Sequence, residues 1–104
     1  TLTYIFFVIL LAPIVEEVTY RGVAMGAMMA RGWSPIAAAV VSSAAFALIH
    51  LQYSPAAMIA IFCAGLGFAF LRIISGTMVV PIVGHIAANL DVVLLQWVFA
   101  PPVT

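Results

Sequence analysis

The sequence predicts an all-α protein, a polytopic bundle of about four transmembrane helices. Hydrophobic residues make up 67% of the 104-residue chain and charged residues only 6%. Soluble domains carry roughly 25% charged residues, so a chain of this composition must face lipid. Its apolar runs extend for 17 residues or more and are rich in Ala, Leu and Met. Because an open sheet cannot satisfy its backbone groups in lipid, these runs are expected to be helices.

Residues that favour turns separate each expected helix from the next. The first helix covers residues 2–30, and Pro13 within it is expected to cause a kink. The other three helices are expected over residues 34–51, 55–74 and 82–100. Prolines stand near their starts, where a missing backbone N–H is tolerated, and Pro101 and Pro102 are expected to end the last helix. The connection before that helix, rich in β-branched residues, is expected to be loose.

A single transmembrane domain is expected over residues 1–104. The chain begins with Thr and has no basic leader, so we expect no signal peptide and infer a piece of a longer membrane protein. The single Cys63 excludes an internal disulfide and a CxxC pair. The net charge is zero and no basic patch occurs, so no nucleic-acid partner is expected. The sequence leaves the oligomeric state open.

Two arginines give the expected orientation. Arg31 lies in the first connection and Arg72 at the end of the third helix, which places both on the same side of the membrane. Because cytoplasmic connections carry an excess of Lys and Arg, this side is predicted to face the cytoplasm of an integral protein of the cell membrane.

Half of the charge lies in "IVEEVTYRG", residues 14–22, in the middle of the first helix. An ionisable side chain at a helix centre costs about 2.5–3.5 kcal/mol to insert, so each needs a partner or a function. Glu17 and Arg21 are four residues apart, in the favourable order for an ion pair. Glu16 is rotated about 100° from Glu17, so it is expected to point elsewhere as an unpaired carboxylate.

Two later helices each carry a histidine four residues from a second notable side chain. Phe46 precedes His50, and His85 precedes Asn89, so each pair shares one helix face. Asp91 lies on a different face from His85; its expected environment is a salt bridge with an arginine such as Arg72, or a watery cavity.

Depth along the helices offers an independent argument for a shared site. Glu16 lies about 22 Å from Arg31, and His50 lies about 24 Å from Ser34 on the returning helix, so the two are expected at a similar level. His85 is only about 14 Å from the connection before its helix. It reaches the same level only if that connection dips into the protein or the helices tilt.

This set of side chains suits two kinds of chemistry. A carboxylate and a neutral imidazole can deprotonate a water for attack on a peptide carbonyl, while a second histidine and an amide stabilise the oxyanion. Alternatively, Glu16, His50 and His85 supply three zinc ligands with an open fourth position. The sequence lacks HExxH, so a zinc site encoded on a single helix is absent.

The three motifs together resemble the CPBP family of intramembrane proteases, which includes type II CAAX prenyl endopeptidases and bacteriocin-processing or immunity proteins. The family pattern EExxxR, FxxxH and HxxxN stands here as "EEVTYR" (16–21), "FALIH" (46–50) and "HIAAN" (85–89). With the flanking "YRG", "AFALIHL" and "VVPIVGHIAANL", the resemblance covers about residues 10–95.

The resemblance implies an intramembrane endopeptidase that cuts a prenylated CAAX-type C-terminus or a membrane-associated peptide. It implies that Glu16 and His50 activate the attacking water and that His85 and Asn89 stabilise the oxyanion. Glu17 and Arg21 would be the supporting pair and Phe46 a packing wall. Members are described both as metal-dependent and as glutamate proteases, so zinc stays open as a cofactor. The alternative is a non-catalytic immunity or scaffold protein that keeps these residues as a polar core.

Overall fold

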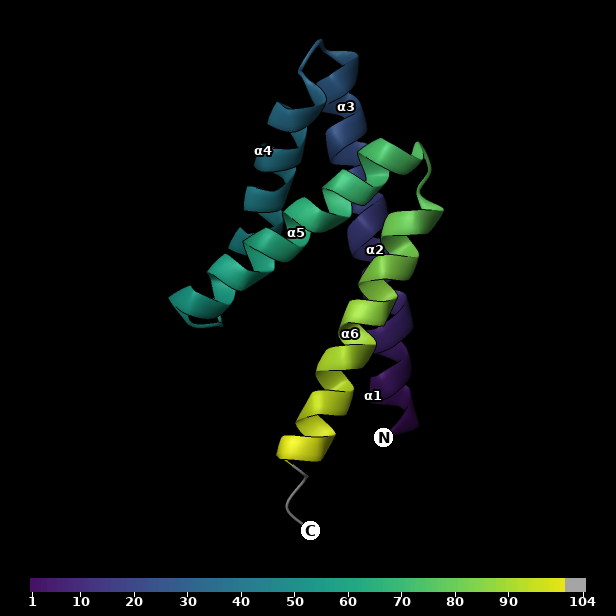
Figure 1. Ribbon diagram of the computed structural model, residues 1–104, viewed down its shortest axis with the longest axis vertical. Coiled ribbons are helices and arrows are strands. Elements are labelled where there is room, and N and C mark those ends of the chain that lie inside the picture. The colour runs from purple at the N-terminus through teal and green to yellow at the C-terminus, as the bar shows by residue number, and fades with distance from the viewer. Residues whose placement is uncertain (101–104) are drawn as a thin grey trace.

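The computed structural model describes residues 1–100, and no strand occurs in this part of the chain (Figure 1). The elements, in chain order, are α1 (Leu2–Phe6), the π-helical η1 (Phe7–Leu11), α2 (Ala12–Glu17), the π-helical η2 (Val18–Ala24), α3 (Met25–Ala30), α4 (Pro35–Leu48), α5 (Pro55–Ser75) and α6 (Val79–Phe99). The first five follow one another without a break, so they form one helix of 29 residues. The predicted all-α class is therefore confirmed.

Three of these helices are long and apolar enough to cross a membrane: Leu2–Ala30, α5 and α6. The fourth apolar helix, α4, has 14 residues and extends about 21 Å, less than the hydrocarbon thickness of about 30 Å. Many large apolar side chains on the outside are exposed, among them Ile36, Ile59 and Val98. This surface suits lipid, so the chain fits an integral membrane protein.

Serine and proline start both α4 and α5. The side chains of Ser34 and Ser54 accept hydrogen bonds from backbone N–H groups three residues ahead, at 3.1 and 3.2 Å. Pro35 and Pro55 take the first helical position, where no N–H is needed. At the other end of α5, Gly76 adopts a left-handed conformation (φ 67°), which ends the helix.

The end of α4 differs from the prediction, because the helix stops at Leu48 and not at residue 51. In a continuing helix the carbonyl of Phe46 would accept the backbone N–H of His50. Here that N–H bonds to Ala47, three residues back, and the imidazole Nδ1 of His50 donates to Phe46 instead, at 2.7 Å. The side chain thus replaces a backbone donor and leaves His50 in a turn.

The start of α6 also differs, since the helix begins at Val79 and not at residue 82. Pro81 falls in the first turn, where its missing N–H costs nothing. The loose connection predicted over residues 75–81 is therefore limited to Gly76–Met78. Pro101 and Pro102, predicted to end the last helix, lie outside the described residues.

Pro13 lies buried inside the continuous first helix, directly after the π-helical turn η1. The N–H of Ala12 bonds to the carbonyl of Phe7, five residues back, so the helix is wider here than an α-helix. The second wide turn, η2, begins directly after Glu17. The chain therefore accommodates Pro13 through a change of helical type.

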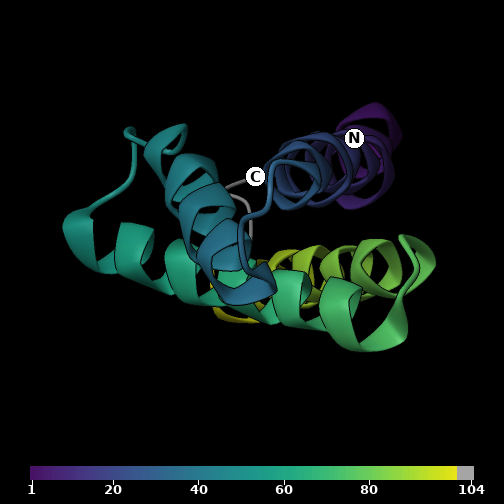
Figure 2. The same cartoon turned by 90° about the horizontal axis from the view of Figure 1, so that it is seen from above.

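The helices pack through small side chains. Ala38, Ala39 and Ala69 form a buried cluster with Met25, where α3, α4 and α5 meet. Farther along, α6 lies beside η1 and α2, while α5 contacts α4, α6 and η2 (Figures 1 and 2). Small residues allow such close approach between membrane helices. Arg21 of η2, which is fully buried, therefore lies where the helices converge.

Candidate active site

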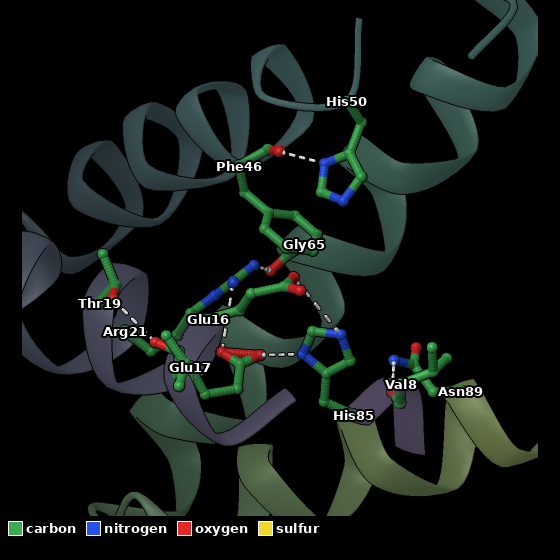
Figure 3. Close-up of polar contacts among 11 residues, drawn as sticks. Val8, Glu16, Glu17, Thr19, Arg21, Phe46, His50, Gly65, His85 and Asn89 are labelled. Carbon is green, nitrogen blue, oxygen red and sulfur yellow. Dashed lines mark hydrogen bonds and ion pairs between the residues drawn. The ribbon is translucent and has the colours of Figure 1, made fainter. Parts of the chain in front are cut away.

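A chain of buried polar groups links three helices. Glu17 and Arg21 are fully buried, and Oε2 of Glu17 lies 3.2 Å from Nη1 of Arg21. Oε1 of the same carboxylate lies 3.1 Å from Nδ1 of His85 on α6. Nη2 of Arg21 donates to the carbonyl of Gly65 on α5, at 2.6 Å. The ion pair expected from the four-residue spacing is present, and the same carboxylate also holds His85 (Figure 3).

Glu16 points away from this pair, as helical geometry predicts. Its side chain is 22% exposed, and Oε2 lies 3.9 Å from Nε2 of His85. In Figure 3 the Glu16 carboxylate lies between the rings of His50 and His85. No hydrogen bond or ion pair joins Glu16 to His50 within residues 1–100. Glu16 is therefore the freer of the two adjacent carboxylates.

His50 is held by one of its ring nitrogens. A carbonyl oxygen only accepts, so Nδ1 must carry the hydrogen that it donates to Phe46. In the neutral ring this leaves Nε2 with its lone pair. The ring is half-buried and stacks against Tyr53, with centroids 6.0 Å apart. This geometry leaves Nε2 able to accept a proton.

Asn89 is oriented by a carbonyl that the wide turn η1 leaves free. In an α-helix the carbonyl of Val8 would accept the N–H of Ala12, but here this N–H bonds to Phe7. Nδ2 of Asn89 donates to this carbonyl at 2.9 Å. The amide therefore ties α6 to the first helix, and one of its two N–H hydrogens stays unused by this bond.

Aromatic rings enclose the histidines. Phe46 meets His50 and His85 edge to face, with centroids 5.0 and 5.7 Å apart, and Cζ of Arg21 lies 4.8 Å from its ring centroid. Phe46 is 3% exposed, so it occupies the place of a packing wall between the two rings. Phe68 of α5 stacks on His85 at 4.4 Å and 13°. Neither Phe68 nor Gly65 belongs to one of the three motifs. In the sequence Gly65 stands out only as a small residue that lets neighbouring helices approach closely, and nothing marks Phe68.

One cavity of about 570 Å³ contains the four residues proposed for chemistry. Glu16, His50, His85 and Asn89 all line it, and the rest of its wall is largely apolar. These other lining residues are Tyr4, Val8, Ala12, Phe46, Tyr53, Ala57, Ala60, Ile61, Ala64, Phe68, Ala88, Val92, Val93 and Gln96. The cavity thus combines a polar cluster with a largely apolar wall, the composition typical of ligand-binding pockets.

His85 reaches this site because its helix starts deeper along the molecule. Figure 1 shows the connection between α5 and α6 part-way down the long first helix, below the turn between α3 and α4. Figure 1 also shows α5 running obliquely to the other helices, and Gly76 and Thr77 of the connection are exposed, so the alternative in which the helices tilt accounts for the contact between His85 and Glu17.

Asp91 lies outside the site. It is exposed, and it forms no ion pair with Arg72 or with any other described residue. The expected salt bridge is therefore absent from this part of the chain.

The family model described as type II CAAX prenyl endopeptidase Rce1-like matches residues 1–90. The chain belongs to this Rce1-like family. The matched segment contains Glu16, Glu17, His50, His85 and Asn89, the polar residues of the site. No curated protein and no solved structure matches the chain. Membership in the Rce1-like family implies an intramembrane CAAX endopeptidase and agrees with the spanning helices.

The three-ligand zinc site considered for this Rce1-like chain does not fit the arrangement of donors. Within residues 1–100, no three His, Cys, Asp or Glu side chains lie close enough together to hold a metal ion.

Proposed function

We propose that this chain carries the catalytic core of an intramembrane endopeptidase that attacks a peptide bond with an activated water. The observation that carries the proposal is the convergence of Glu16, His50, His85 and Asn89 on one cavity. A buried ion pair of Glu17 and Arg21 stands beside it and leaves Glu16 available.

In this mechanism Glu16 and His50 activate the water. His50 accepts a proton at Nε2, because Nδ1 is committed to the carbonyl of Phe46. Glu16 orients the water with its carboxylate, which is partly exposed to the cavity. The water oxygen then bonds to the scissile carbonyl carbon, and when the C–N bond breaks, Nε2 of His50 passes the accepted proton to the departing amine.

His85 and Asn89 stabilise the oxyanion that this attack creates. Nδ1 of His85 donates to Glu17, so Nε2 donates to an oxyanion only when both ring nitrogens carry hydrogen. The second N–H hydrogen of Asn89 supplies a neutral donor from the next turn of α6. The proposal therefore assigns the charged donor to His85 and the neutral donor to Asn89.

The proposed substrate is a prenylated CAAX-type C-terminus or another membrane-associated peptide. The family of the chain and the apolar wall of the cavity both support this class. We also propose that the protein resides in the cell membrane with Arg31 and Arg72 facing the cytoplasm, because cytoplasmic ends carry the excess of arginine.

The test is cleavage by the full-length parent protein in proteoliposomes, with prenylated and unprenylated CAAX peptides and a transmembrane peptide as substrates. Glu16→Gln should lower kcat by about 100-fold, the effect of misplacing a reacting group by about 1 Å, because the water loses the carboxylate that orients it. Asp91→Asn makes the same chemical change at an exposed carboxylate and should leave kcat unchanged. If the wild type cleaves none of the substrates, the protein is a non-catalytic membrane protein and the proposal fails.

Metal analysis of the same preparations tests the mechanism separately. The purified wild type should cleave after dialysis against a chelator, and mass spectrometry should find no stoichiometric zinc. Zinc that is stoichiometric in the wild type and lost in His50→Ala would contradict the proposed water activation.

A further inference from the structure

The helix α5 carries none of the motif residues, yet it contacts both ends of the buried polar chain. We propose that Gly65 and Phe68 of α5 are positioning residues, Gly65 for Arg21 and Phe68 for the ring of His85. This inference rests on the proposed function, because it explains how the groups assigned to catalysis are held in place.

Gly65 is buried and serves Arg21 in two ways. Its carbonyl accepts the hydrogen bond from Nη2 of Arg21 at 2.6 Å. A Cβ at this position would also lie 2.8 Å from the same nitrogen, 3.2 Å from Cδ1 of Phe46 and 3.2 Å from Cβ of Ser43. The guanidinium therefore occupies the space that a side chain would fill, and only glycine allows the carbonyl to come this close.

Phe68 fixes the plane of the His85 ring. The two rings are nearly parallel, with centroids 4.4 Å apart, and Phe68 is 8% exposed. Phe46 meets the edge of the same imidazole at 89°, and Glu17 holds Nδ1. One face, one edge and one nitrogen of the ring are therefore constrained, and Nε2 is left directed towards Glu16.

The two contacts act on one connected group. Gly65 and Phe68 are three residues apart and share a face of α5. Gly65 holds Arg21, Arg21 pairs with Glu17, Glu17 bonds to His85, and Phe68 stacks on His85. A displacement of α5 would therefore shift the imidazole of His85 both through its stacking on Phe68 and through Arg21 and Glu17. Catalytic groups tolerate displacements of only about 0.5 Å.

Gly65→Ala tests the first contact in the full-length protein, with Gly67→Ala as the matched control. A Cβ at Gly67 meets no atom within 4 Å, and Gly67 lies on the same helix. We expect Gly65→Ala to lower kcat by about 100-fold, because misplacement of about 1 Å has this effect, with KM unchanged within about twofold. Gly67→Ala should match the wild type in both constants.

Phe68→Leu tests the second contact and keeps the proposal falsifiable if Gly65→Ala fails to fold. We expect a fall in kcat of about tenfold and a changed pH profile of kcat, since loss of an aromatic contact frees the ring of His85. Phe68→Tyr should restore the profile because it keeps the ring face. Phe70→Leu is the control, since Phe70 is 59% exposed on the same helix.

The outcomes separate this inference from the proposed function. If the wild type cleaves and Gly65→Ala equals Gly67→Ala, or Phe68→Leu keeps the wild-type pH profile, α5 does not position the site. If the wild type cleaves nothing, the proposed function itself fails. Equal losses of kcat and of thermal stability in Gly65→Ala and Gly67→Ala would indicate a role in helix packing alone.

Discussion

The two histidines of the site differ sharply in how firmly the fold holds them. His85 is 4% exposed, bonds to a buried carboxylate and stacks on Phe68. His50 lies in a turn beyond the end of α4, is half-buried and has a single hydrogen bond to a neighbouring carbonyl. The imidazole of His85 is therefore part of the packed interior, whereas that of His50 lies at the edge of this interior.

This contrast separates two catalytic tasks by structure. A group that stabilises developing charge acts best when it is preorganised, as His85 is by contacts on three sides. A group that accepts and releases protons needs a free nitrogen and room to exchange with water, as His50 has in the cavity. We therefore expect substitutions of His50 and of His85 to differ in their effects on activity and on stability.

The largest expected effect follows from removing Arg21, which pairs with the carboxylate that holds His85. Arg21→Met leaves the buried carboxylate of Glu17 without its cation, which should lower the free energy of unfolding by about 3–5 kcal/mol. Denaturant unfolding in detergent micelles measures this change. Arg31→Met alters an exposed arginine and should stay within about 0.5 kcal/mol. A loss below about 1 kcal/mol in Arg21→Met would show that the pair is not important for stability.

The next effect distinguishes the histidines directly. His50→Gln should lower kcat by about 100-fold while the free energy of unfolding falls by no more than about 1 kcal/mol, the net value of its hydrogen bond to Phe46. His85→Gln should also destabilise the fold, by about 1–3 kcal/mol, because Glu17 loses a buried partner. Peptide cleavage and thermal unfolding of the same samples give both numbers. Equal destabilisation by the two substitutions would remove the distinction.

A smaller effect is expected at Pro13, which acts on the site through Asn89. Pro13→Ala favours a regular α-helix, in which the N–H of Ala12 bonds to the carbonyl of Val8, so Asn89 is released and kcat should fall by about tenfold, one lost hydrogen bond. Pro81→Ala is the matched control, since Pro81 is equally buried but lies in a first turn. Cleavage assays at saturating peptide test this, and equal activity in both variants would argue against the link.

The smallest effect sharpens the description of His50. Tyr53 stacks on this ring at 6.0 Å and is 51% exposed, so Tyr53→Leu should lower kcat only about twofold, at the weak end of aromatic contacts. Tyr53→Phe keeps the ring and should equal the wild type. A loss as large as that of His50→Gln would mean that His50 also depends on a rigid environment.

Much of the fold is readable from the sequence because lipid imposes simple rules. Apolar runs and first-turn prolines predict the starts of α4 and α5 to within a residue. The end of α4 could not be predicted, since it depends on the imidazole of His50 replacing a backbone donor. The start of α6 lies three residues before the predicted one, because a first turn tolerates Pro81 and the helix begins ahead of it.

Part of the candidate site is predictable because it depends only on the spacing of residues within one helix. The pair Glu17–Arg21 follows from spacing within one helix, and so does the separate direction of Glu16. The bond from Glu17 to His85 joins residues 68 positions apart and depends on how two helices are rotated against each other. The role of Gly65 rests on a backbone carbonyl, which every residue possesses, so no sequence pattern marks it.

The wide turn η2 requires a fixed number of residues between two buried positions of the first helix. The composition of the segment does not reveal this requirement. Glu17 precedes the turn and faces the site, while Met25 follows it and belongs to the apolar cluster with Ala38 and Ala69. Each residue of an α-helix turns the chain by about 100°, so deletion of one residue within Val18–Ala24 would rotate one position out of its place. A substitution in this segment changes one side chain. A deletion would instead rotate the helix before the turn relative to the helix after it, so that Glu17 and Met25 could no longer both face the interior.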